Sequence, residues 1–143
     1  MYSDLPAAFK AERCVIVINR DLPLGNMANA AAVLALTLGQ RHPALVGDML
    51  EDSDGLRWPG LIPIGISVLA AGEQELSELL HQPQAAQLDR ILFPLDGQQT
   101  TDYAAFRASV AARPSHQWRL LGVALAGEKK AVRKLTGKLK LLA

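Results

Sequence analysis

Hydrophobic residues fall into short continuous runs along the chain, and amphipathic or alanine-rich stretches separate them. The first run, CVIVIN at 14–19, is bounded by charged residues, a pattern typical of a central strand covered on both faces. Further runs predict strands at 61–71, 89–97 and 117–127. Helices are predicted from Gly25 to Gly39 and over 72–82, 99–112 and 128–135. Strands that alternate with helices in this way predict a layered α/β fold with a mostly parallel or mixed sheet.

The helix predicted after the first strand is apolar almost all round. After Asn26, only Asn29 and Thr37 are polar within it. Asn26 or Gly25 can cap its start, and Gly39 can end it. A helix of this kind either packs between the sheet and another element or lies in a subunit interface.

The segment 44–60 contains DSDGLRWPG, in which Asp, Ser, Gly and Pro predict a surface turn. Trp58 lies in this segment. Its side chain is either an exposed contact for a ligand or partner, or folds back on the domain. We expect the second arrangement, which is the more common one for a tryptophan.

Length and composition describe an ordinary globular protein. The 143 residues fit one domain, with an N-terminal extension at 1–12. The single cysteine, Cys14, cannot form an internal disulfide and is expected to be buried. No apolar run approaches the ~20 residues of a membrane span, and the first residues lack the pattern of a signal peptide. We therefore expect a cytoplasmic protein with no membrane partner.

Charge and histidine placement narrow the possible chemistry. A net charge of +1 gives no global basic field, so nucleic-acid binding would need a local patch. The tail EKKAVRKLTGKLKLLA has six basic residues and one acidic residue. It is either a surface for RNA phosphates or anionic lipid, or a solvated helix face, which is the commoner case.

His42, His81 and His116 lack metal-ligand spacing and are expected at surface turns or helix ends. We predict no metal and no cofactor.

The best place for a ligand is the edge where the strands end. In open α/β sheets, ligands bind outside the carboxyl ends of strands and near helix N-termini. Asp21 follows the first strand, Asp96 follows the third, and Thr100 lies four residues further on. Free N–H groups at the start of the helix after Gly25 favour an anion or a carbonyl oxygen at the same edge. Turn chemistry is the alternative, with Asp21 paired locally to Arg20.

Three stretches of the chain resemble the type II peptidyl-tRNA hydrolases. The first strand with the turn RDLPLG and the alanine-rich helix resembles the opening of that family, and LLGVALAGEKKAVRKLTGKLKLL at 120–142 resembles its ending. DGQQT at 96–100 matches its Asp and Thr four residues apart. The likeness runs from about Cys14 to Ala143 and is greatest to an uncharacterised bacterial branch with this fold. It implies a three-layer fold, with helices on both faces of a mixed four-stranded sheet, and often a homodimer.

In the hydrolases the resemblance also implies cleavage of the ester that joins a peptide to tRNA. It implies catalytic roles for Asp96 and Thr100. The lysine of the family's turn has no counterpart, because Asn26 stands at its place, and a second threonine of the family falls near Arg119 or Trp118. A donor beside the scissile ester can be worth ~3–4 kcal/mol of oxyanion stabilisation. Asn26 can donate a hydrogen bond but brings no charge.

Three functions remain open, in this order. The first is a ligand-binding or regulatory protein whose small ligand is held by Asp21, Gly25, Asn26, Asn29 and Arg119. The second is a hydrolase of an ester or amide, including the tRNA end of peptidyl-tRNA. In it Asp96 orients water or acts as base, Thr100 positions the carbonyl, and a raised pKa of Asp96 in an open cleft is the discriminating feature. The third is a subunit whose apolar first helix mediates assembly.

Overall fold

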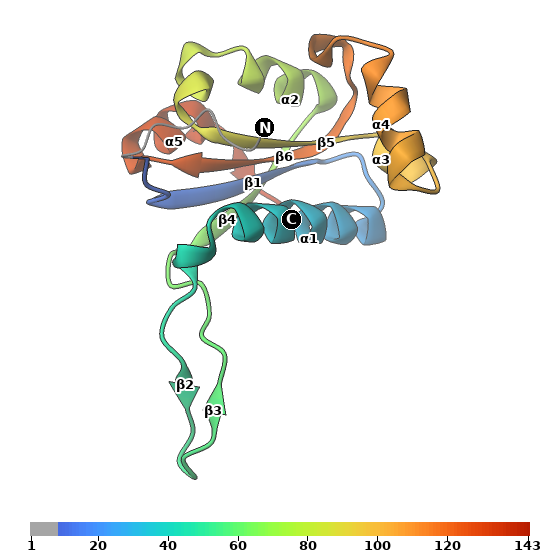
Figure 1. Ribbon diagram of the computed structural model, residues 1–143. Coiled ribbons are helices and arrows are strands. Elements are labelled where there is room, and N and C mark those ends of the chain that lie inside the picture. Colours follow the sequence, from blue (N-terminus) through green and yellow to red (C-terminus); the bar gives the residue numbers. More distant parts are fainter. Residues whose placement is uncertain (1–8) are drawn as a thin grey trace.

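A mixed five-stranded sheet forms the centre of the computed structural model, which describes residues 9–143 (Figure 1). The strands are β1 (Arg13–Asn19), β4 (Ile66–Ala71), β5 (Asp89–Pro94), β6 (Leu120–Gly127) and β7 (Lys140–Leu141). Their order is β5-β6-β1-β4-β7; β1 and β4 are parallel, and each other neighbouring pair is antiparallel. Residues 1–8 of the predicted extension lie outside the described residues.

Helices cover both faces of the sheet, as the sequence predicts. Figure 1 shows α1 on one face, α2 and α5 on the other, and α3 and α4 beyond the end of β5. The helices are α1 (Leu24–Arg41), α2 (Glu73–Leu80), α3 (Asp96–Gln99), α4 (Tyr103–Ala111) and α5 (Lys129–Thr136). Short 3-10 turns lie at Pro43–Leu45, Pro83–Gln87 and Ser115–Gln117. Between residues 9 and 143, no helix has the length and apolar character needed to cross a membrane.

The first strand is apolar at successive positions because both of its faces are buried. Val15 and Val17 pack into the core beneath α2 and α5, whereas Cys14, Ile16 and Ile18 pack beneath α1. Cys14 is buried as predicted, and burial raises the pKa of its thiol. The hydrophobic pattern therefore predicts correctly that this strand is covered on both faces.

Several element boundaries differ from the predictions. The sheet has five strands rather than four, because two residues of the tail form β7 and pair with β4. The strand predicted at 61–71 is shorter, as is the one predicted at 89–97, which ends at Pro94. Proline has no N–H to continue a ladder. Asp96 and Gly97, predicted to end that strand, instead begin the short helix α3. The helix predicted at 99–112 corresponds to α4, and the strand predicted at 117–127 begins only at Leu120.

The long helix α1 also begins and ends elsewhere than predicted. Pro23 precedes its first turn, so neither Gly25 nor Asn26 caps it, and Gly39 lies inside its last turn. The fixed backbone angle of proline suits a helix start. The apolar character of α1 is only partly explained by packing. Ala30, Leu34 and Leu38 are buried against the sheet, but the outward side of the helix is exposed.

The predicted surface turn at 44–60 is part of a projecting hairpin. Its strands are β2 (Leu50–Glu51) and β3 (Arg57–Trp58). Figure 1 shows this hairpin extending away from the body on the α1 side of the sheet. Trp58 is 55% exposed, so the prediction that it folds back on the domain was wrong. Trp58 instead pairs with Leu50 in the two-stranded hairpin, which keeps it away from the body of the domain.

We predict that Leu34→Ala destabilises the fold by about 2–5 kcal/mol. Leu34 is completely buried between α1 and the sheet, so truncation leaves a cavity, while alanine keeps the helix. Leu24→Ala is the control, because Leu24 is 82% exposed on the same helix and its loss is expected to cost no more than about 0.5 kcal/mol. Urea unfolding at pH 7 measures both. Equal stabilities of the two variants would contradict the described packing of α1.

Candidate functional site

The topology brings the carboxyl ends of three strands to one edge of the sheet. β1 and β4 run parallel, and β5 has the same direction because both β1 and β5 are antiparallel to β6. The loops after these strands lead into α1, α2 and α3, and the start of β6 lies at the same edge. The sequence therefore predicts the location of this edge correctly.

Asp21 and Arg119 line one small cavity at this edge. The cavity has a volume of about 270 Å³ and is also lined by Asn19 and Glu73. Arg20 pairs with Glu75 at 2.8 Å, so the local Arg20–Asp21 pair is not formed. Arg119, however, is already engaged, because its Nε lies 2.5 Å from Glu73 Oε1. The cavity thus contains a satisfied ion pair rather than a free cation.

Asn26 and Asn29 are tied to α3. Asn26 Nδ2 donates to Gln98 Oε1 at 2.9 Å, and Gln98 Nε2 donates to Asn29 Oδ1 at 3.4 Å. These bonds join the first turns of α1 to α3 across 72 and 69 residues of sequence. Gly25, which precedes them, is exposed. The two amides have structural partners, and neither lines the cavity that holds Asp21 and Arg119.

Asp96 is held in an internal network. Only 6% of its surface is exposed; Ser109 Oγ donates to Oδ2, and Arg113 Nη2 lies 3.0 Å from Oδ1 and 3.1 Å from Oδ2. The hydrogen bond from Ser109 and the ion pair with Arg113 hold the pKa of the Asp96 carboxyl below its usual value, against the effect of burial. A catalytic base would show the reverse, with a raised pKa in an open cleft.

Thr100 lies beside Asp96 but contacts its backbone. Thr100 Oγ1 donates to the carbonyl oxygen of Asp96 at 2.8 Å, which closes the short helix α3. Its side chain lines a separate groove that Asn29 also borders. The predicted site residues are therefore near one another, but they are distributed over a cavity, a groove and an internal network.

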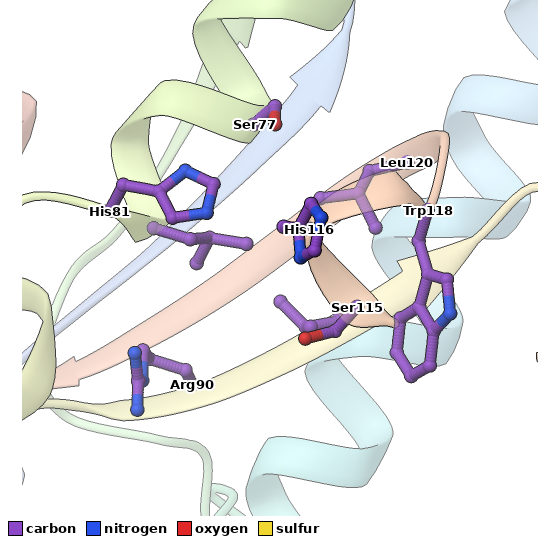
Figure 2. A pocket seen from close by; sticks show the side chains of 9 residues that line it. Ser77, His81, Arg90, Ser115, His116, Trp118 and Leu120 are labelled. Carbon is purple, nitrogen blue, oxygen red and sulfur yellow. The ribbon is translucent and has the colours of Figure 1, made fainter. Parts of the chain in front are cut away.

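A second cavity, of about 350 Å³, lies on the α2 side of the sheet (Figure 2). It is bordered by the end of α2, by β5, and by the loop that joins α4 to β6. Figure 2 shows His81, Arg90 and His116 around this common space. Its lining consists of Ser77, Leu80, His81, Arg90, Leu92, Ser115, His116, Trp118 and Leu120.

The polar side chains that line this second cavity form no bonds with other described residues. Within residues 9–143, no hydrogen bond or ion pair is formed by the side chain of Ser77, His81, Arg90, Ser115 or His116. None of the lining residues is acidic. His81, Arg90, Ser115 and His116 are exposed to solvent, and Ser77 is partly buried. A guanidinium, two imidazoles and two hydroxyls therefore border the cavity with hydrogen-bonding capacity that no other described residue uses.

The loop that carries Ser115 and His116 is fixed in place. Trp118 Nε1 donates to the carbonyl oxygens of Val110 and Arg113, both at 3.0 Å, which anchors the loop to the end of α4. Trp118 also packs at the border of the core under α2 and α5. The cavity wall is thus held by the core and does not depend on a ligand.

The sequence did not indicate this cavity. Its histidines were predicted at surface turns or helix ends without a common site; His81 lies at the end of α2, and His116 lies in a 3-10 turn. The one local signal was Arg90, an exposed charged residue in β5 that lies between the buried Asp89 and an apolar run. In the described part of the chain, no group of three His, Cys, Asp or Glu side chains is placed to hold a metal ion.

Comparison with known proteins gives the family. The sequence pattern of the proteins of unknown function DUF2000 matches residues 12–143. This chain belongs to the DUF2000 family. A search of curated proteins found no match. A solved structure of a protein of unknown function from Agrobacterium tumefaciens has a TM-score of 0.82 and 21% identity. The alignment covers 92% of this chain and 97% of that chain. At this identity the likeness shows a shared fold.

We predict that Asp96→Asn makes this DUF2000 domain less stable by about 1–3 kcal/mol at pH 7, because the bonds to a charged group are lost. The contribution of Asp96 is present above the unfolded-state pKa of about 3.9 and is lost as the pH falls through the lower folded-state pKa. The difference from wild type is therefore expected to shrink in acid. Urea unfolding at neutral and acidic pH checks this.

Asp54→Asn is the matched control, since Asp54 is exposed on the projecting hairpin. It should follow the wild-type pH dependence. If Asp96→Asn were as stable as wild type at neutral pH, the carboxylate would be free for chemistry and the structural role would be refuted.

Proposed function

We propose that this DUF2000 protein binds a small organic anion in the cavity of Figure 2 and is not a hydrolase that uses Asp96. One observation carries the proposal: Arg90, His81 and His116 face the same cavity, no acidic side chain lines it, and none of the three is engaged by another described side chain. A cation without a counter-charge in a preformed cavity favours a negatively charged ligand.

The chemistry of the lining indicates the ligand class. The planar guanidinium of Arg90 matches the two oxygens of a carboxylate or phosphate. The imidazoles and the hydroxyls of Ser77 and Ser115 supply further hydrogen bonds. Leu92, Leu120 and Trp118 offer an apolar surface for a hydrocarbon or ring. The volume of about 350 Å³ is near the lower limit for small-molecule sites, which favours a metabolite over a tRNA end.

We further propose that the fold is that of the type II peptidyl-tRNA hydrolases, adapted to binding. The first strand with its turn and α1, and the last strand with α5, support this relation. The catalytic residues of the hydrolases are not retained with the fold. Asn26 donates to Gln98 in place of the missing lysine, and Asp96 is bound by Arg113. A shared fold does not carry function by itself.

A ligand at the sheet edge is the second candidate, favoured by the cavity that Asp21 and Arg119 line together. A ligand there has to compete with Glu73 for Arg119, because that ion pair is already formed. An exposed pair of this kind is weak, so competition is feasible for a carboxylate or phosphate. The two cavities are distinguished by the arginine on which binding depends.

We predict that Arg90→Gln weakens ligand binding at least about tenfold, or 1.4 kcal/mol, without loss of stability. The screen uses short aliphatic and aromatic carboxylates and phosphate monoesters, and records the rise in melting temperature. Titration calorimetry then gives the dissociation constant of any hit. His116→Gln is expected to weaken binding too, by the loss of one imidazole contact.

Arg119→Gln is the matched control, because it removes an arginine of the sheet edge. Binding lost in Arg119→Gln and kept in Arg90→Gln would place the ligand at the edge. A complete screen without any hit would refute a small organic anion as the ligand.

We also predict no turnover of N-acetylaminoacyl-tRNA by the folded wild-type protein. The carboxylate of Asp96 is engaged by Ser109 and Arg113, so no base is available at the position that the resemblance implies. The assay measures release of the N-acetylamino acid at high enzyme concentration. Turnover that disappears in Asp96→Asn would overturn the binding proposal and establish the hydrolase.

A further inference from the structure

The projecting hairpin exposes several large apolar side chains, as a protein-binding surface does. Every residue from 48 to 59 is exposed. The two strands pair at Leu50–Trp58 and Glu51–Arg57, and further backbone hydrogen bonds run from Asp52 to Leu56 and from Gly47 to Leu61. An isolated two-stranded hairpin is marginally stable in water. We call residues 46–61 the arm; its exposed large apolar side chains are Val46, Met49, Leu50, Leu56, Trp58 and Leu61.

A receiving surface of the same character lies elsewhere on the chain. A groove of about 630 Å³ runs between the outward side of α1, the edge strand β5 and α4. Val33 contributes to it from α1, Phe93 from β5 and Phe106 from α4, and Tyr103 stands at its border with 74% of its surface exposed. Next to the groove, α1 also exposes Leu36. Apolar patches of this kind mark interaction sites.

The arm cannot fill the groove of its own chain. Figure 1 shows the arm leaving near the C-terminal end of α1, whereas α3 and α4 lie at the other end of that helix. A twofold axis perpendicular to α1 reverses this order in a second copy. The arm of one chain then reaches the groove of the other, and the same contact forms twice. Such self-complementarity is what a twofold dimer requires.

Charge supports a second copy as the occupant. The arm contains four acidic residues and one basic residue, Arg57, whereas the whole chain has a net charge of +1. The remainder of the chain therefore has a net positive charge. Asp102 is the one charged residue in the groove lining, and its carboxylate accepts a hydrogen bond from Ala105 N at the start of α4, whereas Arg107 is exposed on the same helix. An arm with an excess of acidic residues is attracted to Arg107 of a second copy. An arm of this length and one helix face approach the 20–30 residues per side of a standard interface.

We propose that two copies of this chain form a dimer in which each arm docks into the groove between α1, β5 and α4 of the other copy. Trp58 is the central anchor, because large aromatic residues that enter apolar grooves dominate interface energies. The proposal does not rest on the proposed ligand, because the groove and the ligand cavity have different linings that share only Leu92.

Sedimentation velocity of the full chain tests the proposal. The wild type is expected to be dimeric at micromolar concentration. Trp58→Ser on the arm and Val33→Glu in the groove are each expected to raise the dimer dissociation constant at least about tenfold. Leu141→Ser is the control and stays dimeric, since Leu141 is equally apolar and exposed but lies on β7. Circular dichroism shows that the variants are folded.

Cross-linking identifies the contact directly. A Trp58→Cys chain is mixed with a Val33→Cys chain of different mass, and the pair is mildly oxidised. A mixed disulfide-linked dimer is expected, and Cys14 gives no background because it is buried. A Leu141→Cys chain in place of Val33→Cys should give none. A monomeric wild type, or a dimer that both Trp58→Ser and Val33→Glu leave intact, would overturn the proposal.

Discussion

The burial of β6 on both faces is the constraint on which the rest of the structure depends. All eight residues of this strand are buried, and it lies between β5 and β1. A strand of this kind is stable only if helices cover both faces, and α1 does so on one side and α2 and α5 on the other. Gly122 shows how closely the neighbouring strand β1 and the helix α1 approach β6. A Cβ atom at this position would lie 2.7 Å from the carbonyl oxygen of Val17 and 3.1 Å from the side chain of Leu34.

This close packing leaves the two buried carboxylates of the described residues, Asp89 and Asp96, at the two ends of β5, where they hold neighbouring segments in place. Asp89 accepts hydrogen bonds from Arg41 at 2.8 Å and contacts His42 at 2.7 Å; despite burial, these partners hold the pKa of the Asp89 carboxyl below its usual value. Asp96 is held by Arg113 in the same way. Removing one partner of a buried pair costs much more than the pair contributes. Such carboxylates therefore have a structural role. A cavity whose polar side chains form no bonds to other described residues is the better guide to a ligand site.

The sequence predicts the layers because hydrophobic runs report burial directly. It also predicts that Asp96 and Thr100 are close, because they are only four positions apart in the chain. It does not predict the ion pair between Asp96 and Arg113, which are 17 positions apart. That contact forms only because the end of α4 lies close to Asp96. His81, Arg90 and His116 lie around one cavity for the same kind of reason. Their proximity depends on how β5 and β6 pair, and their spacing in the sequence does not indicate it. Trp58 was misplaced because the sequence cannot tell a turn on the surface from a hairpin that leaves it.

The edge strand β5 connects the two proposed surfaces. Arg90 lies in the cavity lining, Ile91 and Phe93 lie in the groove, and Leu92 borders both. A partner arm in the groove would cover the open side of β5 and hold its backbone in place, and Arg90 is carried by that backbone. The other wall of the cavity, at His81, belongs to α2 on the opposite face. Assembly would thus act on one wall of the ligand cavity and leave the other unchanged, so the dimer would adjust the position of the arginine relative to the imidazoles rather than create the site.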